Sequence, residues 1–87
     1  MGSYQQIYDE VRQEAGREVR RRHILDVLIL RFDPAASAYR EIEKLVIKIK
    51  DDEILYRLFA TSIKANTFTD FQSTLQQVIT PVEKETA

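Results

Sequence analysis

Ile24-Leu25-Asp26-Val27-Leu28-Ile29-Leu30-Arg31-Phe32 is the stretch that decides the fold of this chain. A helix through it is apolar nearly all round, which is typical of the centre of a core. A short buried strand is the competing interpretation, because the run is short and rich in β-branched residues. No turn signal separates it from the periodic segment before it. We therefore predict a helix.

The same helix extends far upstream. Ser3 and Gln6 form a capping box that predicts its start, and no proline interrupts it before Pro34. We expect it to run from about Tyr4 to Phe32, a length of about 42 Å, and therefore to project past a small bundle. Its first half carries one narrow apolar stripe with a spacing of four residues: Ile7, Val11, Ala15 and Val19. So thin a stripe on a charged helix needs a partner helix.

A second helix is predicted after Asp33 and Pro34, which suit its N-cap and its first position. Its apolar face is Ala35, Ala38, Tyr39, Ile42, Leu45, Val46 and Ile49. Residues 46–50 alone would suit a strand, but the longer helical period overrides that pattern.

Two more helices are predicted in the remainder. Asp51 suits the N-cap of the third, and Asn66 suits a left-handed residue at its end. Thr67 and Asp70 then resemble a capping arrangement for the fourth helix, which stops before Pro81. The two apolar faces are Ile54, Leu55, Leu58, Phe59 and Ile63, then Phe68, Phe71, Leu75, Val78 and Ile79.

The predicted fold is one all-α domain, a small four-helix unit whose long N-terminal helix projects and self-associates. Residues 1–32 form that helix, residues 33–80 the three-helix remainder, and residues 81–87 a frayed tail. A chain of 87 residues buries only roughly 60–65% of its unfolded surface. It has no cysteine and one histidine, so disulfides and a histidine-held zinc are excluded as stabilisers. Self-association is the remaining means by which so small a domain gains stability.

Composition excludes several classes of function. The net charge is −1, which gives no global electrostatic case for nucleic acid or membrane. No apolar run approaches the ~20 residues of a membrane span, and the N-terminus lacks the pattern of a signal peptide. We expect a cytoplasmic protein that does not contact a membrane.

The basic cluster Arg17, Arg20, Arg21 and Arg22 is the candidate for phosphate contact. Acidic residues flank it on both sides, and no aromatic residues interleave to stack on bases. A solvated helix face with internal ion pairs is the favoured interpretation.

No enzyme is predicted. His23 has no nucleophile on its helical face, and Glu41 with Lys44 is explained by an ordinary helical pair. Two glycines, Gly2 and Gly16, cannot make a phosphate-binding loop. We predict no catalytic residue, no metal site and no cofactor.

The segment Glu14-Ala15-Gly16-Arg17-Glu18, the run 24–32 and Thr67-Phe68-Thr69-Asp70-Phe71 together resemble the C-terminal helical domain of Rpn-type proteins. These are recombination-promoting nuclease and transposase-like proteins of bacteria, especially cyanobacteria. In that family a PD-(D/E)XK nuclease domain precedes a charged linker of E-G-x-x-E-G type, of which residues 14–18 would be a degenerate end. The resemblance covers about Val11 to Ile79. It implies an accessory role without catalytic residues, because none of the family's catalytic motif occurs here.

The sequence therefore predicts a non-enzymatic helical module for oligomerisation or protein interaction. A homodimer through Ile7, Val11, Ala15 and Val19 is the favoured assembly, and another protein is a further candidate partner. The alternative is a nucleic-acid-associated accessory domain of a transposase-like or nuclease-like protein.

Overall fold

The computed structural model describes the backbone of residues 2–79 and the side chains of residues 9–79. It contains four helices in this part of the chain: α1 (Gly2–Phe32), α2 (Ala36–Val46), α3 (Asp52–Lys64) and α4 (Phe68–Ile79). The predicted all-α class and the long N-terminal helix are confirmed. The predicted frayed tail, residues 81–87, lies outside the described residues.

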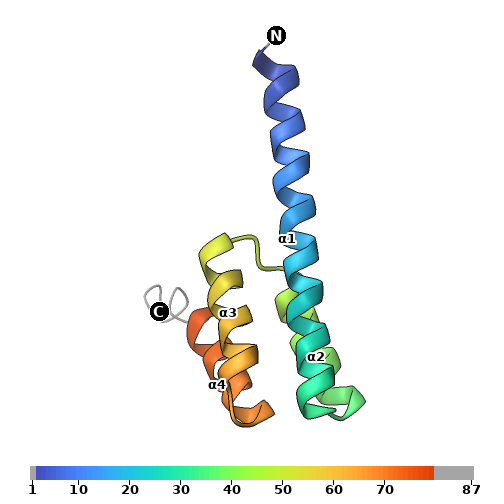
Figure 1. Cartoon of the computed structure of the whole chain (residues 1–87), viewed down its shortest axis with the longest axis vertical. Coiled ribbons are helices and arrows are strands. Elements are labelled where there is room, and N and C mark those ends of the chain that lie inside the picture. Colours follow the sequence, from blue (N-terminus) through green and yellow to red (C-terminus); the bar gives the residue numbers. More distant parts are fainter. Residues whose placement is uncertain (1, 80–87) are drawn as a thin grey trace, which may run out of the picture.

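The first helix extends well beyond the other three (Figure 1). Its C-terminal half packs against α3, and α3 in turn packs against α4. The radius of gyration is 14.8 Å, whereas a compact domain of this length has about 12 Å. The projecting part of α1 accounts for the excess, because the other helices are only 11–13 residues long.

The core lies where the lower half of α1 meets the other three helices. Ile24 and Leu28 supply it from α1, and both are fully buried. The other core residues are Leu25, Ile42, Val46, Ile49, Leu55, Leu58, Phe71 and Leu75. Each fully buried side chain of this size contributes roughly 1.5–3 kcal/mol. Most of the stability therefore resides in this body and not in the projecting part of α1.

The predicted central helix is open on one side, so that prediction was wrong in part. Leu30 is 83% exposed and Ile29 is 42% exposed. Three short helices cover only the sides of α1 that carry Ile24, Leu25 and Leu28. The apolar run is therefore buried on one half of its surface and faces solvent on the other.

Several predicted helix ends differ in the structure. The first helix begins at Gly2, before Ser3 that we predicted to cap it. Asp33 does not cap α2: it ends α1 with φ 45°, and its N–H donates to the carbonyl of Ile29 at 3.0 Å. The second helix begins after Ala35, which makes no side-chain capping bond. An aspartate tolerates the left-handed conformation better than most residues, which explains the different role.

Two other predicted helix ends were also wrong. The second helix stops at Val46, and Ile49 lies buried in the connection to α3 instead of in the helix. The third helix ends at Lys64 and is followed by Ala65 in an extended conformation. Asn66 is not among the described residues with positive φ.

The caps of α3 and α4 are confirmed. Asp51 Oδ1 accepts from the N–H groups of Glu53 and Ile54 at 2.9 and 3.1 Å. Thr67 Oγ1 accepts from the N–H of Asp70 at 3.1 Å. These bonds satisfy N–H groups that have no partner within the first turn of a helix.

Candidate interaction surface

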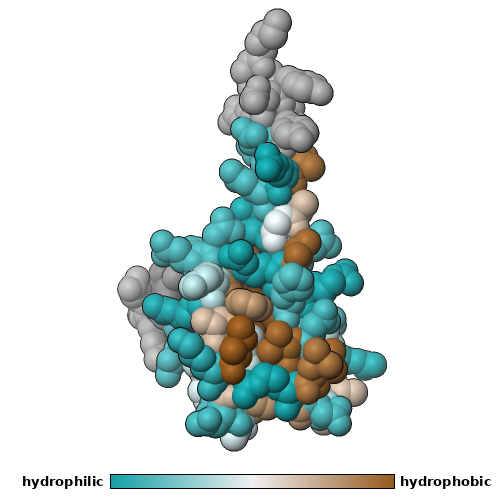
Figure 2. All heavy atoms as spheres, viewed as in Figure 1, coloured by the Kyte–Doolittle hydropathy of each residue, from teal (hydrophilic) through white to brown (hydrophobic). Residues whose placement is uncertain are grey.

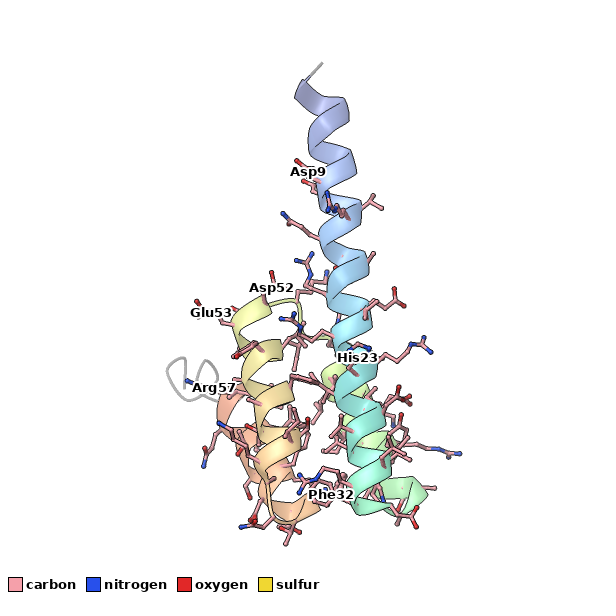
Figure 3. All side chains as sticks on the ribbon, viewed as in Figure 1. Asp9, His23, Phe32, Asp52, Glu53 and Arg57 are labelled. Carbon is pink, nitrogen blue, oxygen red and sulfur yellow. The ribbon has the colours of Figure 1, made fainter. Side chains whose placement is uncertain are left out.

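We call residues 2–16 of α1 the stem. It precedes Arg17, the first described residue of α1 that forms an ion pair with another element. Asp9 lies high on the stem, while Asp52 lies at the N-terminal end of α3, level with the base of the stem (Figure 3). In the part of the stem whose side chains are described, residues 9–16, every residue is exposed except Glu14, which is half-buried.

Three of the four residues predicted to self-associate are exposed along α1. Val11 is 65% exposed, Val19 is 53% exposed and Ala15 is also exposed. The side chain of Ile7 lies outside the described residues. Hydrophobic surface occurs at separate points along the projecting helix, and a larger group of it lies lower down over α1 and α3 (Figure 2).

Leu30 extends this exposed surface onto the body. It follows Val19 by eleven residues, which is about three helical turns, so the two lie on one line along α1. We call Val11, Ala15, Val19 and Leu30 the outer face of α1. Sequence reasoning missed Leu30, although its eleven-residue spacing from Val19 was a visible signal.

A network of charged residues fixes the base of the stem to the body. Arg21 is 7% exposed, and its Nε and Nη2 donate to the carbonyl of Ile49 at 2.9 and 2.7 Å. Its Nη1 donates to Glu14 Oε1 at 2.9 Å. Arg17 Nε donates to the other oxygen of Glu14 at 3.1 Å, and its Nη1 lies 3.8 Å from Asp52 Oδ2. The network joins α1 to the connection between α2 and α3.

The two guanidinium groups also set the charge state of Glu14. Hydrogen bonds from Arg21, and then from Arg17, lower the pKa of the Glu14 carboxyl below its ordinary value. The carboxylate therefore stays ionised, and bonded to both arginines, at a lower pH than an ordinary glutamate would.

The four arginines proposed for phosphate contact do not form one exposed cluster. Arg17 and Arg21 point into the network at the base of the stem. Arg20 and Arg22 are exposed, but Arg22 lines a groove between α1 and α2 together with acidic residues. That groove is lined by Glu14, Glu18, Arg21, Arg22, Leu25, Asp26, Tyr39, Glu43 and Ile47.

Tyr39 is the one hydroxyl-bearing residue that lines this groove. Burial, followed by the charges of Glu43 and Asp26, raises the pKa of its phenol, so the side chain stays protonated to a higher pH than a free tyrosine. His23 is exposed on α1 and does not line this groove. Within the described residues, no three His, Cys, Asp or Glu side chains come together as a metal site.

At the opposite end of the body, Arg31 joins α1 to α3. Its Nη1 donates to the carbonyl of Ser62 at 2.6 Å, and its guanidinium lies 4.6 Å from the centre of the Phe32 ring. Phe32 in turn meets Phe68 edge to face, with ring centres 6.2 Å apart. These contacts hold Arg31 and Phe32 against the body. Leu30, the residue before them in α1, remains open to solvent.

The chain matches no family model, no curated protein and no solved structure. No helix in the described part of the chain is both long and apolar enough to cross a membrane.

Proposed function

We propose that this protein is a non-enzymatic helical module that associates with a second copy of itself through the outer face of α1. The observation that carries the proposal is the exposure of Val11 and Val19 on a helix that extends beyond its own body. A cytoplasmic location and an accessory C-terminal role, as in the Rpn-type proteins that the sequence resembles, belong to the same proposal.

The physical argument begins with the stem. Most of the stability of a helix in a protein comes from the packing of an apolar face and not from helix propensity. The stem is 15 residues long, counted from residue 2 to residue 16, and Gly16 lowers its helix propensity further. A second helix packed on Val11 and Val19 would cover the apolar side chains that α1 leaves exposed in the stem and just beyond it.

The interaction is expected to be weak. Burying the four valine side chains of a dimer contributes several kcal/mol, and association entropy offsets part of it. We expect a dissociation constant of about 1–100 μM, which corresponds to roughly −8.2 to −5.5 kcal/mol.

Sedimentation equilibrium at tens of micromolar tests the proposal. The unmodified chain should show a reversible monomer–dimer equilibrium, and Val11→Glu should stay monomeric over the same concentrations with most of its helix content retained. Tyr56→Glu is the matched control, because Tyr56 is 64% exposed on α3, away from the outer face. A monomeric unmodified chain would remove the support for this function.

The alternative is an accessory domain that contacts nucleic acid. It has the exposed Arg12, Arg20 and Arg22 in its favour. Against it, Arg17 and Arg21 are engaged internally, and a phosphate-binding face normally concentrates charge of one sign.

Fluorescence anisotropy with a duplex DNA at low salt separates the two functions. We expect no binding tighter than the weak non-specific range. A tight, strongly salt-dependent affinity that is lost in Arg20→Glu/Arg22→Glu would favour the alternative.

A further inference from the structure

We propose that two copies pair with their first helices antiparallel and centred on Val19, so that the stem of each copy lies along the body of the other. This inference rests on the proposed function and adds the orientation and register of the contact. In this register, positions at equal distances before and after Val19 face each other across a two-fold axis.

The open side of α1 is continuous across Val19. Leu25 faces the groove toward α2, and Ile24 and Leu28 are buried in the core. The remaining side of α1 carries Val19 and Leu30, which are 53% and 83% exposed. From Val11 to Leu30 this side spans about 28 Å, so it offers a partner helix a contact of several turns.

Charges on this side select the antiparallel orientation. Arg12 stands seven residues before Val19, and Asp26 stands seven residues after it. Seven residues are about two turns, so both lie close to the line of Val19. Both are exposed, Asp26 at the border between this side and the groove toward α2, and neither is in an ion pair among the described residues.

An antiparallel pair about Val19 places Arg12 of each copy against Asp26 of the other, which gives two ion pairs by symmetry. Ala15 and His23, four residues before and after Val19, also face each other, a small residue against a larger one. A parallel pair would instead place Arg12 of one copy beside Arg12 of the other, and Asp26 of one copy beside Asp26 of the other. Like charges at such positions are destabilising.

Site-specific cross-linking of the full chain tests the register. The chain has no cysteine, so Ala15→Cys and His23→Cys each introduce a single thiol at an exposed position. A bismaleimide that reaches across one helix pair is added to each variant alone and to an equimolar mixture. Ser73→Cys, exposed on α4, is the control for random collision.

We expect a cross-linked dimer in the mixture of Ala15→Cys and His23→Cys and little in either variant alone. Cross-linking of each variant with itself would show a parallel pair and overturn this inference while the proposed function stands. A dimer that cross-links at neither position would place the contact on another face and also overturn it. A monomeric unmodified chain would overturn both.

Charge reversal provides a second readout that needs no cysteine. Arg12→Asp and Asp26→Arg should each weaken the dimer about tenfold, because each replaces two attractive pairs with two repulsive ones. The double variant should recover most of the loss. Arg20→Asp, a charge reversal on the same helix but off this line, should change the dissociation constant less than about threefold. Absence of recovery in the double variant would contradict the pairing of Arg12 with Asp26.

Discussion

The buried guanidinium of Arg21 donates two hydrogen bonds to the backbone carbonyl of Ile49, at 2.9 Å from Nε and 2.7 Å from Nη2. Ile49 lies in the connection between α2 and α3, outside both helices, so its carbonyl does not accept a hydrogen bond within a helix. The side chain of Arg21 therefore completes the backbone hydrogen bonding of a segment 28 residues away in sequence. This contact fixes the connection to α1 and, through it, the direction of the stem.

Arg21→Ala should destabilise the fold by about 1–3 kcal/mol, because it leaves a buried carbonyl without a donor. Arg20→Ala removes an exposed arginine next to it and should change the free energy of unfolding by no more than about 0.5 kcal/mol. Urea denaturation followed by circular dichroism measures both. Equal effects of the two substitutions would contradict the anchoring role of Arg21.

Stability should fall in acid partly through Glu14. Its folded-state pKa is lowered by hydrogen bonds from Arg21 and Arg17, so its contribution is fully present above the unfolded value of about 4.3. The contribution is lost as the pH falls through the lower folded pKa. The carboxylate is close to half exposed, so salt should weaken the effect.

Glu14→Gln isolates this contribution. At pH 7 the variant should have a lower urea midpoint than the unmodified chain, and the difference should shrink toward zero as the pH falls below about 4. Glu18→Gln, which removes an exposed carboxylate outside the network, is the control. A difference that stays constant from pH 7 to pH 3 would show that the charge of Glu14 is not responsible.

Leu28 and Leu30 stand two residues apart, and the same substitution should destabilise the fold at Leu28 far more than at Leu30. Leu28 is fully buried, whereas Leu30 is 83% exposed. Leu28→Ala should cost about 2–5 kcal/mol, since it removes buried methyl groups and leaves a cavity. Leu30→Ala should change the stability of the body by less than about 0.5 kcal/mol. Thermal and urea unfolding of the two variants, at a concentration where the chain is monomeric, checks the contrast.

Rules that use only neighbouring residues predicted where the helices lie better than they predicted which residues those helices bury. Asp51 and Thr67 were identified as caps because a short side chain reaches the N–H groups of its own first turn, a contact that depends on a few neighbouring residues. Asp33 was assigned to the wrong helix because a residue between two helices can serve the end of one or the start of the other. The backbone angle that decides between them depends on the direction of the following helix.

The candidate surface was only partly predictable for a related reason. The four-residue spacing of Val11, Ala15 and Val19 identified a stripe on a charged helix. The exposure of Leu30 depends on how many sides of α1 the short helices cover. The apolar run 24–32 taken alone does not indicate this, and only the spacing of Leu30 from Val19 pointed to it. Arg21 likewise differs from its neighbours Arg20 and Arg22 only because the connection to α3 passes beside it.

Gly16→Ala should strengthen the stem without removing any contact. A Cβ added at Gly16 meets no atom within 4 Å, and alanine is favoured over glycine inside a helix by about 0.8–1 kcal/mol. Circular dichroism should show greater helix content under conditions where the chain is monomeric. Because the proposed dimer uses the stem of both copies in its helical form, a helix that is better formed before binding should also associate more tightly, by at most about 15- to 30-fold if both copies gain the full amount. Higher helix content with unchanged or weaker association would indicate that the stem is not part of the contact.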